Sequence, residues 1–418
     1  MIMMKIFPAD ILLPDFSVVD GTKWACVACD QYTSEPEYWE RVSEAVKGSP
    51  STLSLMLPEV WLEDSEKRVP PIHAAMRKYI SDGVLKEHPA CGIYLERIQS
   101  DGKLRRGLVC AIDLEDYDFS AGSSSPIRPT EKTVVERIPP RLAVRRGAPI
   151  EMPHVMLLVD DPDDTILSRF AGREPDAYSF DLAEGGGSVK SAFVNADEFE
   201  SLNASLAILA ENAKIRAEKN GGAPITVAVG DGNHSLATAK ASWHEIKATL
   251  TEEEAKTHPA RYALAEICNL HEESLVFEPI YRSLENIDVM ELAKDFEAFA
   301  TAQNGRFPAQ TFDMILEGNN VEVVIEHPEY TLPVASLQHF LDEWMKSHPR
   351  AVIDYIHGED TLCRLAARDA CAGFVFEGMS KADLFPAVEA DGVLPRKTFS
   401  MGHAADKRFY IECRKILK

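Results

Sequence analysis

Apolar and polar positions follow two different periods along the chain, and one stretch shows the change between them most clearly. Residues 225–229 form a β-branched apolar run, which predicts a buried strand. Residues 230–233, Gly-Asp-Gly-Asn, tolerate positive φ and predict a tight turn. From Ser235 the sequence becomes alanine-rich, which predicts a helix. The stretch therefore predicts a strand, a turn and a helix in direct succession.

The rest of the chain alternates in the same way. Helical spacing of apolar residues predicts a long helix over residues 198–220, and Gly221–Gly222 would end it. Turn residues at 100–102 and 184–188 predict two hairpins. Further strands are predicted at 25–29, 51–57, 153–159, 321–325, 351–356 and 373–376, and further helices at 334–347, 361–369 and 381–391. Strand–helix alternation with short connections indicates a mixed α/β (α+β) fold.

A chain of 418 residues is long for one hydrophobic core, so two domains are expected. Residues 301–310, TAQNGRFPAQ, have the composition of a linker. We therefore predict a core domain over residues 1–300, with an N-terminal extension and the 230–235 turn, and a C-terminal α/β domain over residues 311–418.

Charge and composition narrow the function classes. The formal net charge is −23, from 67 acidic and 44 basic residues, which argues against a nucleic-acid surface. No apolar run is long enough to cross a bilayer, and the N-terminal residues do not resemble a signal peptide, so we expect a soluble, cytoplasmic protein. The eight cysteines are irregularly spaced and fit reduced thiols.

One segment reverses the acidic balance. Residues 128–146 contain two acidic side chains, Glu131 and Glu136, and six basic ones: Arg128, Lys132, Arg137, Arg141, Arg145 and Arg146. A solvated helix face with paired charges is the alternative explanation. We favour an anion-facing role for this segment.

The predicted strand–turn–helix has the geometry of an anion site. Backbone N–H groups point out of a helix N-terminus, and the helix dipole favours negative charge there. Asp231 and His234 lie in the same turn, so an anion, a metal and a proton-transfer group could meet at this point. The alternative is a tight connection in which Asp231 or Ser235 only caps the helix.

Four segments resemble a known family. Asp231–Ala239 (DGNHSLATA) resembles the Asp-Gly-His-His-Arg…Thr-Ala signature of the family called domain of unknown function 1015. Residues 29–35 are similar to its Tyr-Asp-Val-Ile-Ser segment. Residues 130–133, with Arg141, are similar to its His-Glu-Lys-Thr…Asp-Arg segment, and residues 394–398 to its Pro-Lys-Ser-Thr segment. The order of the segments agrees across nearly the whole chain.

The Asp-Gly-His-His-Arg turn of this family is also similar to a turn in free-serine kinases, which have the ParB/sulfiredoxin-like fold. The resemblance implies a ParB/sulfiredoxin-like core and nucleotide-dependent phosphoryl transfer to a small hydroxyl-bearing molecule. Its implied cofactors are Mg²⁺ and a nucleotide (ATP, ADP or CTP). Two residues depart from the signature: Asn233 replaces its first His, and Ser235 replaces its Arg. The candidates to replace that Arg are Lys240, Arg128, Lys132, Arg141 and Lys397.

On this hypothesis Asp231, His234 and Glu131 are the catalytic residues, and the two carboxylates are also the Mg²⁺ ligands. His234 would donate to phosphate or move a proton. The phosphate-binding residues would be Gly230, Gly232, Asn233, Ser235, Lys132, Arg141, Lys240 and Lys397.

Other interpretations stay open. Asp231 could be a helix cap, His234 a buried polar group with its bonds satisfied, and Arg141 a surface partner of Glu131 or Glu136. The whole chain could be a non-catalytic nucleotide- or anion-binding module, or a phosphoester hydrolase. A small-molecule substrate is expected in the enzymatic cases, with neither nucleic acid nor membrane as partner. The sequence does not indicate an oligomeric state.

Overall fold

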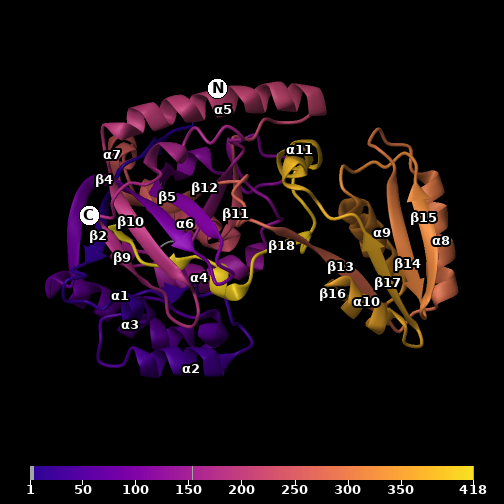
Figure 1. Cartoon of the computed structure of the whole chain (residues 1–418), viewed down its shortest axis with the longest axis horizontal. Coiled ribbons are helices and arrows are strands. Elements are labelled where there is room, and N and C mark those ends of the chain that lie inside the picture. The colour runs from indigo at the N-terminus through magenta and orange to yellow at the C-terminus, as the bar shows by residue number, and fades with distance from the viewer. Residues whose placement is uncertain (1–3, 153, 418) are drawn as a thin grey trace.

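The computed structural model describes residues 4–152 and 154–417, and its fold is mixed α/β, as predicted. Figure 1 shows two lobes, with β13 (Phe277–Glu285) and β18 (Phe399–Met401) between them. Each lobe is built around a sheet of its own.

The first sheet has twelve strands within the described residues, and its main path runs β6-β11-β8-β12-β5-β4-β2-β20-β7. Strand β1 pairs with β5, and β10 joins β9 to β4. The strands are β1 (Ile6–Phe7), β2 (Ala9–Pro14), β4 (Leu85–Ile98), β5 (Leu104–Asp113), β6 (Ile127–Pro129), β7 (Ile150–Glu151), β8 (Met156–Val159), β9 (Tyr178–Asp181), β10 (Ser188–Asn195), β11 (Val227–Asp231), β12 (Tyr262–Asn269) and β20 (Cys413–Lys415). A separate pair is formed by β3 (Cys26–Val27) and β19 (Phe409–Tyr410).

Side chains of neighbouring residues in a strand point to opposite faces of the sheet. Helices cover both faces of this sheet, so both sets of side chains are buried. Ile93 belongs to one core cluster, with Trp24, Tyr38 and Ile72, whereas Tyr94 belongs to another, with Leu206 and Leu236. The α-helices of this lobe, together with α11, are α1 (Gly21–Trp24), α2 (Pro36–Ala45), α3 (Ser65–Ser81), α4 (Ile138–Arg145), α5 (Glu198–Asn220), α6 (Asn233–Lys247), α7 (Glu252–Thr257) and α11 (Lys381–Asp391). The short 3₁₀ helices are η1 (Thr52–Leu55), η2 (Glu59–Asp64), η3 (Leu114–Asp116), η4 (Val135–Arg137), η5 (Ser168–Phe170), η6 (Pro259–Arg261) and η7 (Ala404–Asp406).

The second sheet runs β15-β14-β17-β13-β16, and β18 pairs with the start of β13. Its remaining elements are β14 (Gln310–Leu316), β15 (Asn319–Ile325), β16 (Val352–His357), β17 (Cys371–Phe376), α8 (Val289–Ala302), α9 (Pro333–Ser347) and α10 (Glu359–Ala366). Helix α11 connects the lobes, because it packs on α5 and Arg216 of α5 donates to Glu389 at 2.9 Å.

Most of the predicted elements are present. Helix α5 covers residues 198–220 and α11 covers residues 381–391, as predicted, and β9–β10 form a hairpin around residues 184–188. The strand predicted at 51–57 is wrong. Ser51 accepts the N–H of Leu53 with its hydroxyl and starts the 3₁₀ helix η1 there. The strand predicted at 153–159 begins in β8 at Met156, and Pro153 lies outside the described residues.

The division into residues 1–300 and 311–418 stays a prediction. Residues 303–309 connect α8 to β14, which lie in the same lobe. Strand β13 precedes them and belongs to the second sheet, whereas β20 follows them and belongs to the first.

Two segments from the last part of the chain return to the turn after β11. The N–H of Leu394 donates to the carbonyl of Thr130 at 2.8 Å, and Glu131 forms a parallel bridge with Leu394. Strand β19 lies beside β3 and follows Lys407, whose ammonium reaches Asp231. The fold therefore brings residues 131, 231, 397 and 407 to one place.

Candidate functional site

The turn between β11 and α6 can be built only with glycine at two positions. Gly232 has φ +78°, and a Cβ there would lie 2.9 Å from Cα of Val155. A Cβ on Gly230 would lie 2.7 Å from the side chain of Leu158. Both glycines therefore let the turn lie directly against β8.

The N-terminus of α6 is open. Its N-cap is Gly232, and no side chain among the described residues caps it. Asp231 is not the cap, because its Oδ1 accepts the N–H of Gly232 at 2.9 Å. The buried Oδ1 of Asn233 has no hydrogen-bond partner within the described part of the chain. The first N–H groups of the helix are thus available to an anion.

The two predicted catalytic carboxylates lie within electrostatic reach of each other. Burial, together with the negative charge of Asp231, raises the pKa of Glu131 against the opposing effect of Lys397. The backbone of Lys397 likewise acts to lower the pKa of Glu131. Oδ2 of Asp231 lies 3.3 Å from Nζ of Lys407, and both side chains are about four-fifths buried. Two acidic and two cationic side chains therefore surround the turn.

His234 faces the basic segment. Its Nε2 accepts the N–H of Val134 at 3.3 Å, which places the ring proton on Nδ1. Burial and the charges of Arg141 and Arg137 lower the pKa of His234 to about 4. The ring is therefore neutral at physiological pH, and Nδ1–H is its hydrogen-bond donor.

The lowered pKa of His234 predicts that the folded protein loses stability in acid. The folded protein binds fewer protons at His234 than the unfolded chain does between pH 6.5 and about 4, so its contribution to stability falls as the pH falls through that window. We expect urea denaturation at pH 7 and 4.5 to show a smaller loss for His234→Gln than for the unchanged protein. The matched control is His339→Gln, at an exposed position. Equal losses in all three proteins would contradict this origin.

Some of the predicted phosphate-binding residues lie at the turn, and others lie away from it or are bonded elsewhere. Lys397 lies beside Glu131, and Ser235 and Arg141 lie beside the turn. Arg141 already has a partner, because it donates to Glu59 rather than to Glu131 or Glu136. Lys132 is exposed. Lys240 is buried on α6 and donates to the carbonyl of Leu114 at 2.7 Å, and burial lowers its pKa. Arg128 likewise donates to backbone carbonyls at Ser123 and Ala223.

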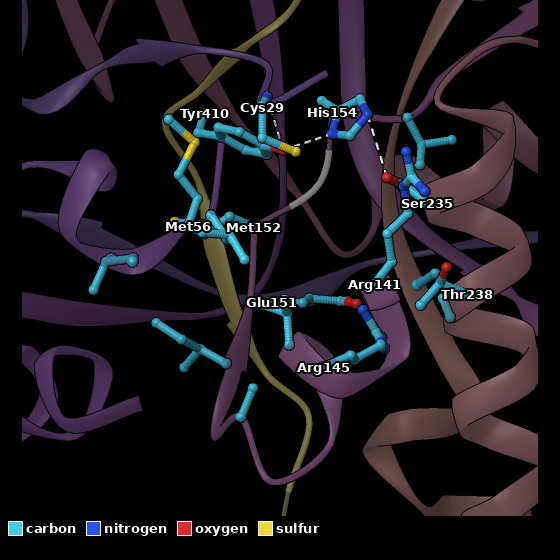
Figure 2. Close-up of a pocket in the computed structure, with 18 of the residues that line it drawn as sticks. Cys29, Met56, Arg141, Arg145, Glu151, Met152, His154, Ser235, Thr238 and Tyr410 are labelled. Carbon is cyan, nitrogen blue, oxygen red and sulfur yellow. Dashed lines mark hydrogen bonds and ion pairs between the residues drawn. The ribbon is translucent and has the colours of Figure 1, made fainter. Parts of the chain in front are cut away.

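Sequence reasoning missed a polar group that adjoins Ser235. Nε2 of His154 lies 3.2 Å from Oγ of Ser235, and its Nδ1 lies 2.7 Å from the hydroxyl of Tyr410, which in turn donates to Sγ of Cys29 at 3.1 Å (Figure 2). Oδ2 of Asp30 lies 3.5 Å from the same Nε2. Burial alone would lower the pKa of His154, but the Asp30 carboxylate raises it above its usual value.

Only some of the residues that sequence reasoning missed lie in a recognisable motif. Asp30 lies in the 29–35 segment that carries the family resemblance, so it could have been chosen. His154 and Lys407 stand alone in stretches without a motif, and only the fold brings them to the turn.

The chain is similar to one protein family and, at low identity, to several solved structures. The family described as "Protein of unknown function (DUF1015)" matches residues 14–344. No curated protein matches the chain. Among solved structures, a free serine kinase in complex with AMP is similar with a TM-score of 0.37 at 12% identity, covering 74% of this chain and 92% of that one. A conserved hypothetical protein from Pyrococcus furiosus has a TM-score of 0.33 at 12% identity, covering 74% and 95%. SbnI from Staphylococcus aureus, with a C-terminal truncation, has a TM-score of 0.33 at 10% identity, covering 72% and 82%.

No helix among the described residues combines the length and apolar character needed to cross a membrane. No group of three or more His, Cys, Asp or Glu side chains in the same residues could hold a metal ion.

Proposed function

The chain belongs to the DUF1015 family of proteins of unknown function, and we propose that it is a nucleotide-dependent phosphotransferase acting on a small hydroxyl-bearing molecule. One observation carries the proposal: the open N-terminus of α6 lies beside two carboxylates, Asp231 and Glu131, and two ammonium groups, Lys397 and Lys407. Phosphoryl transfer consists mostly of positioning and charge neutralisation, and these groups supply both.

Each residue then has a role. The N–H groups at the start of α6, with Lys407 and Lys397, would bind the phosphates of the nucleotide. The acceptor oxygen forms a bond to the terminal phosphorus, the bond from that phosphorus to the bridging oxygen breaks, and the shortened nucleotide leaves. Glu131, whose pKa burial raises, would take the proton of the acceptor hydroxyl. Nδ1–H of His234 would donate to a phosphate oxygen.

Mg²⁺ fits this site only with help from the nucleotide. The described residues offer two carboxylates rather than a cluster of three, and Asp231 is already paired with Lys407. Mg²⁺ is often held by one or two carboxylates and the phosphates of a substrate, so Asp231, with Glu131 beside it, would hold the ion together with the nucleotide. When bound, the ion would neutralise the charge on the phosphates.

Calorimetry with ATP, ADP and CTP, each with and without Mg²⁺, tests the binding step. We expect a Kd below about 1 mM for at least one nucleotide, and at least tenfold weaker binding by Lys407→Met, because that ammonium, 3.3 Å from Asp231, would bind the phosphates. Lys346→Met, on the exposed side of α9, is the matched control.

Turnover with a pool of small alcohols and amino acids then separates the activities. A phosphorylated acceptor supports the phosphotransferase. Nucleotide hydrolysis without an acceptor would instead support a phosphoester hydrolase. Tight binding without turnover would support a non-catalytic nucleotide-binding module. The absence of binding at millimolar nucleotide would overturn all of the nucleotide-dependent interpretations.

A further inference from the structure

A cavity of about 150 Å³ shares the first turns of α6 with the phosphate site. Ser235, Leu236 and Ala239 line it from α6, and Arg141 and Arg145 line it from the neighbouring helix α4, with Met56 on the opposite side (Figure 2). Most of the remaining wall is apolar: Leu55, Met56, Leu57, Met76, Ile150, Met152 and Leu264. A cavity of this size holds a ligand about as large as a six-membered aromatic ring.

The charged residues in the wall already have partners. Arg141 donates to Glu59, and Arg145 donates to Glu151 at 2.5 Å. Glu151 also accepts from Arg414 at 2.9 Å. A charged ligand would have to break one of these pairs or lose its hydration without a partner, and both changes cost free energy. The cavity therefore disfavours anions and zwitterions.

The end of the cavity nearest the turn is polar. The hydroxyl of Ser235 and the ring of His154 meet there, and the Ser235 hydroxyl can both donate and accept (Figure 2). The Tyr410 hydroxyl holds the far side of the His154 ring and already donates to Cys29. The charge of Asp231 acts on His154, and the charge of Lys407 acts on Asp30, so this end adjoins the phosphate site. A hydroxyl bound there would lie beside the proposed phosphates.

We propose that this cavity binds the acceptor of the transferred phosphoryl group, and that the acceptor is a small uncharged alcohol with an apolar body. Its hydroxyl lies beside Ser235 and His154, and its body lies against the apolar wall. This assignment rests on the proposed phosphotransferase function. It excludes free amino acids as preferred acceptors, because their ammonium and carboxylate groups would meet only side chains that are already paired.

Binding of benzyl alcohol to the full chain, measured by calorimetry and ligand-observed NMR without nucleotide, tests the site. We expect benzyl alcohol to bind with a Kd in the millimolar range or below, and more tightly than glycerol or L-serine. Ala239→Leu fills the cavity from α6 and should weaken benzyl alcohol binding at least tenfold, with nucleotide affinity within twofold of the unchanged protein.

Ala263→Val fills less volume and serves as the second variant if Ala239→Leu does not fold. Ala298→Leu on the exposed side of α8 is the matched control and should bind benzyl alcohol normally. Tighter binding of L-serine or glycerol, no binding of benzyl alcohol, or equal binding by the cavity-filling variants would overturn the assignment while nucleotide binding still stands. Alcohol binding without nucleotide binding would overturn the phosphotransferase and the acceptor role with it.

Discussion

Asp231→Asn is expected to lower the rate of nucleotide-dependent phosphoryl transfer by a factor of about 10²–10⁴. The substitution removes the negative charge that faces Lys407 and that would hold Mg²⁺. An asparagine oxygen can still accept the N–H of Gly232, so the turn keeps its shape. The ion pair with Lys407 is about four-fifths buried, so its loss costs about 1–2 kcal/mol, between the values for exposed and fully buried pairs. The melting temperature should therefore fall by only a few degrees.

Steady-state kinetics at saturating nucleotide, with a thermal melt of the same sample, measures both quantities. Asp354→Asn is a closely matched control, because the Asp354 carboxylate also accepts the N–H of the next residue, at 2.8 Å, but lies on β16 in the other lobe. Undiminished transfer in the Asp231 variant would show that this residue only shapes the turn. A large fall in its melting temperature would show a structural role instead.

The second large effect is on stability. Glu266→Gln should reduce the free energy of unfolding by about 3–5 kcal/mol, because removing one partner leaves buried charge uncompensated. Glu266 is fully buried and pairs with Arg408 at 2.9 Å and Arg105 at 3.5 Å. In the variant Arg105 would lose its carboxylate partner at 3.5 Å and Arg408 would lose the one at 2.9 Å, although Arg408 keeps Glu412 at 2.6 Å.

Urea denaturation at pH 7 gives this difference directly. Glu343→Gln removes one partner of an exposed i,i+3 pair with Lys346 and should not change the midpoint measurably. A decrease in the free energy of unfolding below about 1 kcal/mol for Glu266→Gln would show that water or a shifted side chain compensates the positive charge of the arginines. Because Arg408 lies between Lys407 and Tyr410, the variant should also loosen the proposed phosphate site.

Local features of the chain were predictable where local physics determines them. The turn at Gly230–Gly232 and the helix α5 follow from backbone conformation and apolar spacing within about twenty residues. The strand predicted at residues 51–57 failed because one hydroxyl, that of Ser51, outweighed the apolar run after it. Lys240 was chosen for its charge and its distance along the chain, but its place on α6 directs its ammonium to the carbonyl of Leu114.

The long-range part of the site was predictable only in outline. The family resemblance selected residues 131, 231 and 397, which the fold does bring together. Lys407 and His154 reach the same turn through strand order and loop closure, for which a single sequence carries no periodic signal. The ParB/sulfiredoxin-like assignment of the core stays a prediction.

Strand β20 lies between β2 and β7 in the first sheet, so residues 413–415 separate two strands made from residues 9–14 and 150–151. During synthesis most of the chain leaves the ribosome before this gap can be filled, and domains normally fold as they emerge. The nascent N-terminal lobe must therefore wait with an incomplete sheet, in which β2 and β7 expose unpaired edges. Lys407 and Tyr410 arrive in the same late segment, so a ribosome that stops before residue 407 releases a chain in which Asp231 lacks its partner Lys407.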